Sequence, residues 1–226
     1  MHGPQYTRAG GNAADLESIA RSLAAWHSHT AWSYGPMHRR WRPLGNRRFL
    51  ERRLANDLAS YRPLNPAGGD RLAAWIDRNV LRTWRGKPRL GHGDSNFSNM
   101  VMASEGPCWI DLSAAAFQSP AEDLARLYGT ALHTSPQLWN CFLDGYFAAQ
   151  PQEARRAVIA DFPVSLVQHF LRAARFVSLA ATETTSAARW AESWWPRIEA
   201  LLEAAEARAP TETLLREPNA GFRRVA

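Results

Sequence analysis

The sequence predicts an α+β fold that is mostly helical, with a small β-hairpin near its middle. Apolar residues recur at helical spacing before about residue 84 and again after residue 119. Between these two parts, short apolar runs flank Gly106-Pro107, a pattern typical of strands joined by a turn. The chain has 226 residues, of which 46% are hydrophobic, so it can bury a substantial core.

In the first part of the chain, an irregular lead-in over residues 1–12 precedes the first expected helix. Leu16, Ile19, Leu23 and Trp26 then recur at helical spacing. Glycine and proline residues between positions 30 and 44 predict a long loop. Two further helices are expected at about 46–60 and 69–84, because each range carries one apolar face.

Three short strands and four helices are expected in the remaining sequence. The strands lie near residues 88–90, 99–103 and 107–111. The helices are expected at 120–133, 135–149, 152–182 with an interruption at Pro163, and 186–208. The predicted organisation is therefore a lead-in over 1–12, one domain over 13–209 and a flexible tail over 210–226.

The composition limits where the protein works. The chain has no run of 18 apolar residues, so no membrane-spanning helix is expected. Its first residues lack the apolar core of a secretory signal. The two cysteines, Cys108 and Cys141, do not have metal-ligand spacing and are expected to be buried thiols in a reducing compartment. These observations predict a cytoplasmic protein.

Charge is distributed unevenly along the chain. Residues 1–90 contain 16 basic and 6 acidic side chains, whereas residues 91–226 contain 11 and 15. Such an imbalance can indicate a nucleic-acid-binding surface. The sequence lacks the alternation of aromatic and basic residues that such surfaces use, so the sequence argues against nucleic acid as a partner. A solvated helix face explains most of the arginines.

One short stretch carries most of the chemical information. His92-Gly93-Asp94 is followed by Asn99, five residues after the aspartate, and Asp111 lies twelve residues further on at the end of an apolar run. Taken singly, these aspartates and asparagines would be ordinary turn or cap residues. A metallophosphoesterase also uses His-Gly-Asp, but its paired-histidine motifs are absent from this sequence.

Together these residues resemble the H-G-D-x-x-x-x-N loop and downstream aspartate of aminoglycoside phosphotransferases and choline kinases. The resemblance implies the C-terminal, catalytic lobe of a kinase-like fold. It also implies that Asp94 is the catalytic base, accepting the proton of an acceptor hydroxyl. Asn99 and Asp111 would be the ligands of Mg²⁺, which prefers oxygen donors.

Other segments extend the resemblance along the chain. Ser119-Pro120-Ala121-Glu122-Asp123-Leu124-Ala125 resembles a family segment in which an aspartate near a helix start is tied to the catalytic loop. Asp123 and His92 are therefore expected to have structural roles. By motif position, Val101 and Ile110 would form an apolar wall against the adenine of ATP. Leu23-Ala24-Ala25-Trp26-His27 resembles the helix with which this lobe begins.

The family's N-terminal lobe is expected to be missing. That lobe carries a glycine-rich loop and a lysine that hold the nucleotide phosphates. Only about 15 residues precede the helix that contains Leu23–His27, and no lysine occurs before Lys87. Three explanations are open: a truncated or mis-started gene product, a minimal protein that binds nucleotide weakly or completes its site with a partner chain, or a non-catalytic relative.

Two functions remain open from the sequence. The first is ATP-dependent transfer of a γ-phosphate to a hydroxyl of an aminoglycoside-, choline- or sugar-like small molecule. The alternative is a non-catalytic, kinase-like binding or regulatory module. An intact base with both metal ligands favours the enzyme, because a binding module has no chemical need for all three.

Overall fold

The computed structural model describes most of the chain and divides it into two compact units. The described residues are 13–37, 46–79, 87–180, 184–207 and 211–217. The first unit comprises Met1–Gly45 and Trp84–Ile159, and the second comprises Asn46–Thr83 and Ala160–Ala226. The lead-in predicted over residues 1–12 lies outside the described residues.

The helices of the first unit enclose a well-packed apolar core. Helix α1 (Ala13–Trp26) packs against α5 (Pro136–Ala148). Gly145 allows this close approach, since a Cβ there would lie 3.1 Å from the Cα of Glu17. Leu16, Ile19 and Leu23 of α1 are completely buried, or nearly so. The predicted helical spacing in this segment is therefore confirmed, and α1 provides a fixed support for the loops described below.

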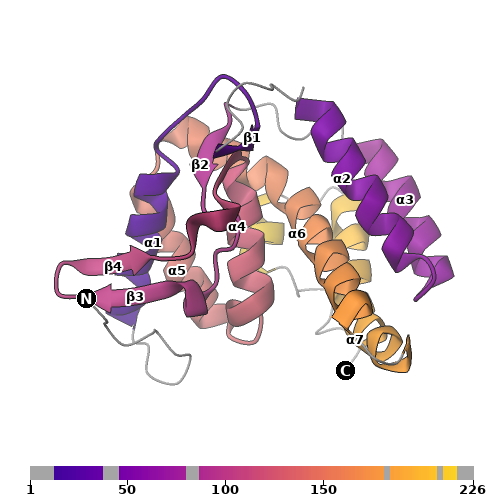
Figure 1. Cartoon of the computed structure of the whole chain (residues 1–226). Helices are drawn as coiled ribbons and strands as arrows, with labels where there is room; N and C mark the ends of the chain where they lie inside the picture. The colour runs from indigo at the N-terminus through magenta and orange to yellow at the C-terminus, as the bar shows by residue number, and fades with distance from the viewer. Residues whose placement is uncertain (1–12, 38–45, 80–86, 181–183, 208–210, 218–226) are drawn as a thin grey trace. The chain divides into compact units, whose positions relative to one another are not determined.

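Two small antiparallel sheets complete the first unit. In the three-stranded sheet, the central strand β5 (Ala116–Gln118) pairs with β1 (Gly35–Pro36) and with β2 (Arg89–Gly91). The other sheet is the hairpin of β3 (Met100–Ala103) and β4 (Gly106–Trp109), which lies beside α1 (Figure 1). The three predicted strands are present, whereas β1 and β5 are too short to show in the pattern.

Helix α4 (Pro120–Leu127) follows β5 directly and has a clear N-terminal signal. Ser119 is its N-cap and Pro120 occupies its first turn. The helix predicted over 120–133 is shorter than expected, because the backbone changes to a π-helix, η5 (Tyr128–Leu132). Single π turns of this kind often occur next to functional sites.

The second unit consists of helices held by aromatic contacts and ion pairs. The ring of Tyr61 is buried against Phe170 and Trp195, at centroid distances of 5.1 and 6.5 Å. Arg71 and Arg78 form ion pairs with Glu199 and Glu206. Its elements are α2 (Asn46–Tyr61), α3 (Pro66–Asn79), the larger part of α6 (Gln152–Ala180), α7 (Thr184–Glu206) and α8 (Thr211–Arg216).

Three expectations about these elements need correction. Helix α3 begins at Pro66 because Asn65 accepts a hydrogen bond from the Gly68 amide at 2.9 Å. The interruption predicted at Pro163 is wrong, since α6 continues through it. Part of the expected flexible tail forms α8, in which Leu214 and Leu215 are buried.

The structure also shows the exposure of the two cysteines and the character of the helices. Cys108 is exposed and Cys141 is half-buried, so the expectation of two buried thiols is wrong. No helix in the described part of the chain is long and apolar enough to cross a membrane.

Candidate active site

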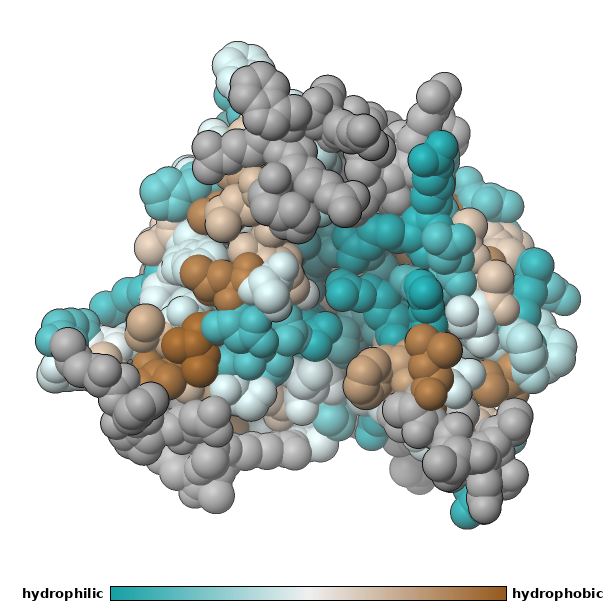
Figure 2. Space-filling view, in the orientation of Figure 1, coloured by the Kyte–Doolittle hydropathy of each residue, from teal (hydrophilic) through white to brown (hydrophobic). Residues whose placement is uncertain are grey.

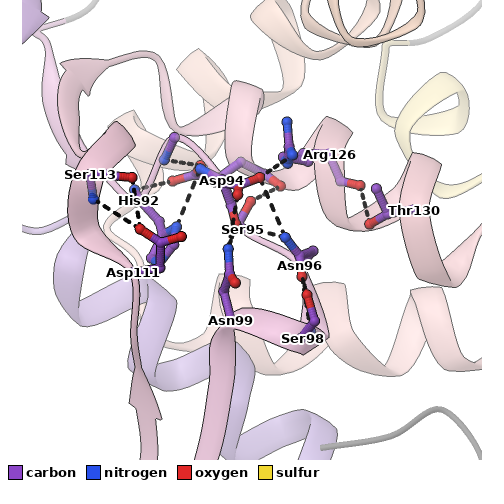
Figure 3. A network of polar contacts seen from close by, with 12 residues as sticks. His92, Asp94, Ser95, Asn96, Ser98, Asn99, Asp111, Ser113, Arg126 and Thr130 are labelled. Atoms are coloured by element: carbon purple, nitrogen blue, oxygen red, sulfur yellow. Dashed lines mark hydrogen bonds and ion pairs between the residues drawn. The ribbon is translucent and has the colours of Figure 1, made fainter. Parts of the chain in front are cut away.

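Asp94 lies in the loop between β2 and the short 3₁₀ helix η3 (Phe97–Asn99). Its side chain is half-buried, and hydrogen bonds from two amides fix the loop around it. Asn99 Nδ2 donates to the Asp94 carbonyl oxygen at 3.0 Å and to Oδ2 of its carboxylate at 2.9 Å. Asn96 Nδ2 also donates to the same carbonyl, at 3.1 Å (Figure 3). These bonds hold the carboxylate at the surface of the loop.

The hairpin brings Asn99 and Asp111 to the same end of two strands. Met100 pairs with Trp109, and the Ile110 amide donates to the Asn99 carbonyl at 2.9 Å. Asp111 follows directly, with a left-handed φ of 56°. Because the Asn99 amide nitrogen is used by Asp94, its side-chain carbonyl is the group left for another ligand.

Ser113 holds the Asp111 carboxylate in place. Its hydroxyl donates to Asp111 Oδ1 at 2.7 Å and its amide donates to the same oxygen at 3.4 Å. The side-chain bond, and then the backbone bond, hold the pKa of this exposed carboxyl below its ordinary value. The carboxylate is therefore ionised at neutral pH.

This donor set fits a magnesium ion that keeps most of its positions for other ligands. The Asn99 carbonyl and the Asp111 carboxylate are hard oxygen donors. Within the described ranges, no group of three or more His, Cys, Asp or Glu side chains is arranged to hold a metal. A site with only two protein ligands suits Mg²⁺, which retains water and phosphate oxygens, better than it suits zinc.

Gly93 sets the approach between the loop that contains Asp94 and the segment after β4. Its φ is +77°, and a Cβ at this position would lie 2.1 Å from the carbonyl oxygen of Ala114, which ends the 3₁₀ helix η4 (Leu112–Ala114). Only glycine fits this contact. The close approach places Asp94 and Asp111 on neighbouring segments.

His92 lies in the interior, where it contacts the hairpin, and its structural role remains a prediction. Its side chain is completely buried, and Nε2 lies 2.8 Å from the Ile110 carbonyl oxygen. The ring lies between Trp26 and Trp109, at centroid distances of 5.9 and 5.3 Å. Trp109 in turn donates to the Ser22 hydroxyl of α1 at 2.9 Å. His92 thus connects the loop that contains Asp94 to the hairpin.

Asp123, in the first turn of α4, holds the loop over residues 92–95 through hydrogen bonds. Its carboxylate accepts the amides of His92 at 2.7 Å and Gly93 at 2.8 Å. Its backbone carbonyl accepts the Ser95 hydroxyl at 2.8 Å. Burial opposes ionisation, but the hydrogen bond and charge of His27 and the two amides outweigh it, so the net pKa of Asp123 is lowered.

His27 extends this buried network to α5. Its Nε2 donates to Asp123 Oδ2 at 3.0 Å, and its Nδ1 lies 2.6 Å from the Tyr146 hydroxyl. Burial, with the negative charge of Asp123, raises the pKa of Tyr146, which therefore stays protonated. Nothing in the sequence pattern indicated these two partners of His27.

Arg126 is the site residue that sequence reasoning missed. It lies one turn after Asp123 on α4, and its Nη2 forms an ion pair with Asp94 Oδ1. The side chains of Arg126 and Asp94 are 27% and 29% exposed, so both can be reached from solvent. The spacing of Asp123 and Arg126 on one helix was the available signal, because it places both on the face that meets the loop.

Val101 and Ile110 lie on the hairpin, beside the loop. Val101 in β3 is half-buried, and Ile110 and Leu112 are exposed by 37% and 43%. In Figure 2, a hydrophobic cluster lies over part of the β3–β4 hairpin, and hydrophilic side chains lie next to it near the start of β3. An apolar surface therefore borders the polar site, and its contact with adenine remains a prediction.

Comparison with known proteins places these features in context. The model of the phosphotransferase enzyme family matches residues 2–159. Comparison with curated protein sequences gives no match. The fold is similar to that of the proposed fructosamine-3-kinase of Thermobifida fusca YX-ER1, with a TM-score of 0.55 and 21% identity over 85% of this chain and 68% of that chain. It is also similar to choline kinase from Cryptosporidium parvum Iowa II, with a TM-score of 0.58 and 10% identity over 95% and 73% of the two chains. These similarities confirm the predicted kinase-like fold.

Proposed function

Because this chain belongs to the phosphotransferase enzyme family, we propose that it transfers the γ-phosphate of ATP to a hydroxyl group of a small molecule. The observation that supports this most directly is the arrangement of Asp94, Asn99 and Asp111 on one loop and the hairpin that follows it. Asn99 holds the Asp94 carboxylate at 2.9 Å, while the hairpin carries Asp111 to the same end as Asn99. A carboxylate beside two hard oxygen ligands is what phosphoryl transfer requires.

Each residue has a distinct part in the proposed reaction. Asp94 accepts the proton of the acceptor hydroxyl, whose oxygen then forms the new bond to phosphorus. Asn99 and Asp111 would hold Mg²⁺. When bound, this ion would neutralise negative charge on the phosphate oxygens. Asp123, through the amides of His92 and Gly93, keeps the loop in the geometry that this step needs.

The adenine of ATP is proposed to lie on the hairpin surface. Val101 and Ile110 offer an apolar wall there, next to Asn99 and Asp111. A nucleotide bound in this way would direct its phosphates toward the two metal ligands. The acceptor is proposed to be an aminoglycoside-, choline- or sugar-like molecule.

Two measurements on the full chain test the proposed function. Calorimetry with ATP and Mg²⁺ should show binding to the wild type and to Asp94→Asn alike, because Asp94 is not a proposed nucleotide ligand. Transfer of labelled γ-phosphate to an acceptor panel should fall by about 10²–10⁴ in Asp94→Asn. Asp77→Asn, an exposed change of the same chemistry on α3, is the matched control. ATP binding without transfer to any acceptor would instead favour the kinase-like binding module.

A further inference from the structure

Arg126 makes a contact that the proposed reaction does not explain. Its guanidinium pairs with Oδ1 of Asp94, and Asn96 Nδ2 lies 3.4 Å from the same oxygen. Asn99 meanwhile donates to Oδ2. Both carboxylate oxygens of Asp94, the proposed base, therefore already accept hydrogen bonds. Oδ1 already has two donors, so an acceptor hydroxyl can reach this oxygen only if Arg126 or Asn96 moves away.

Arg126 is the donor best able to move to a ligand. A guanidinium has five N–H donors, arranged to bind a carboxylate or phosphate through two parallel bonds. Its Nε is buried and, within the described residues, has no hydrogen-bond partner. A buried donor without an acceptor is unfavourable unless a bound ligand satisfies it. An anionic group on a ligand would supply that acceptor.

The two oxygens of Asp94 face different parts of the site. Oδ2 is bonded to Asn99, one of the proposed metal ligands, whereas Oδ1 is bonded to Arg126. In the view of Figure 3, Asp94 lies between Asp111 on one side and Arg126 on the other. The phosphates belong with Asn99 and Asp111, so the side of Arg126 is the one left for the acceptor.

We propose that Arg126 selects acceptors that carry an anionic group, such as a carboxylate or phosphate, close to the reacting hydroxyl. This inference rests on the proposed phosphotransferase function. The anionic group takes the guanidinium and satisfies its Nε, which leaves Asp94 Oδ1 free for the hydroxyl. The hydroxyl proton passes to Asp94, the acceptor oxygen bonds to phosphorus, and the diphosphate leaves with the electron pair of the broken P–O bond.

The same arrangement disfavours cationic acceptors. A polycation beside Asp94 would meet a guanidinium that already neutralises the carboxylate, so repulsion would offset the attraction. Aminoglycoside-like and choline-like molecules are therefore the poorer candidates among the acceptors proposed above. Hydroxy acids, sugar acids and phosphorylated sugars are the better ones.

Acceptor binding by the full chain tests this without requiring turnover. Saturation-transfer NMR would compare matched pairs that differ in one carboxylate, glycerate with glycerol and gluconate with glucitol. The wild type should bind the anionic member of a pair at least about tenfold more tightly, because a hydrogen bond to a charged group contributes about 1.5–3 kcal/mol. Arg126→Gln should abolish this preference, whereas Arg126→Lys should retain part of it.

The control variant is Arg21→Gln, which breaks the exposed Arg21–Glu17 ion pair in the same unit and should behave as wild type. Equal binding of the two members by the wild type, or an unchanged preference in Arg126→Gln, would overturn the proposal. So would a loss of ATP affinity in Arg126→Gln with the acceptor preference intact, because Arg126 would then serve the nucleotide. Anion-selective binding without phosphate transfer to any acceptor would support this inference and count against the proposed function itself.

Discussion

The imidazole of His27 and the carboxylate of Asp123 lie 3.0 Å apart, and both side chains are almost completely inaccessible to solvent. The residues are 96 positions apart in the chain; His27 directly follows α1, and Asp123 lies in α4. The same carboxylate accepts hydrogen bonds from the backbone amides of His92 and Gly93, so the position of the loop that contains Asp94 depends on this buried pair. Four consequences of the structure can be measured.

Asp123→Asn should destabilise the first unit. The asparagine side chain has nearly the shape of the carboxylate but lacks its charge. Its NH₂ group would take the place of one carboxylate oxygen and would face a backbone N–H donor. Breaking one partner of a buried ion pair costs about 3–5 kcal/mol. Urea unfolding, followed by the fluorescence of tryptophans such as Trp109, would measure this loss. Asp77→Asn, which changes an exposed carboxylate, should alter the free energy of unfolding by less than about 0.5 kcal/mol.

The contribution of Asp123 should also depend on pH. Its pKa in the folded protein lies below the ordinary value of 3.8, so the unfolded chain binds this proton more readily. The stabilisation is therefore complete above that value and is lost as the pH falls through the lowered pKa. The stability difference between wild type and Asp123→Asn should stay constant from neutral pH to about pH 5 and shrink below about pH 4. A difference that grows on acidification would contradict this assignment.

Gly93→Ala and Gly106→Ala form a matched pair. Both glycines have positive φ values, +77° and +122°, so alanine is strained at either position. A Cβ at Gly106 meets nothing within 4 Å, whereas a Cβ at Gly93 collides with the Ala114 carbonyl oxygen. Gly106→Ala should cost about 1–3 kcal/mol, the usual cost of such strain, and Gly93→Ala should cost more. Thermal unfolding would rank them, and phosphate transfer should be lost mainly in Gly93→Ala.

Asp111→Asn should weaken nucleotide binding only when Mg²⁺ is present. The variant removes one of the two proposed protein ligands, and it leaves Val101 and Ile110 in place. Calorimetry with ATP at saturating Mg²⁺ and again in EDTA would separate the two contributions. Ser113→Ala should have a smaller effect of the same kind, about tenfold in affinity, because Ser113 only orients Asp111. An equal loss in EDTA would show that Asp111 has another role.

Local pattern was sufficient for most of the fold. The periodic apolar residues of α1 and the turn at Gly106-Pro107 gave helices and strands close to those observed. Strand β5 was not predicted, because three residues between a 3₁₀ helix and a proline carry no periodic signal. The continuity of α6 through Pro163 also could not be predicted, since tertiary packing outweighs the local cost of one lost hydrogen bond.

In the site, too, residues close in sequence could be predicted, whereas contacts between distant elements could not. Asp94, Asn99 and Asp111 could be selected because their spacing within one loop and one hairpin is local. The Arg126–Asp94 pair joins residues on different elements, 32 positions apart, and becomes visible only when α4 is placed against the loop. The partners of His27 were missed for the same reason, because Asp123 and Tyr146 lie on two other helices.

The register of the β3–β4 hairpin has an evolutionary consequence. The pairing of β3 with β4 fixes the positions of Asn99 and Asp111 relative to each other. The paired residues run from Met100 opposite Trp109 to Ala103 opposite Gly106. Residues added at the tip, between Ala103 and Gly106, would lengthen the turn and leave the two ligands where they are. A single residue inserted within either strand would reverse the facing of every side chain beyond it. Natural length variation in this hairpin should therefore be confined to its tip, and grafting experiments can use that position to attach reporter peptides without disturbing the site.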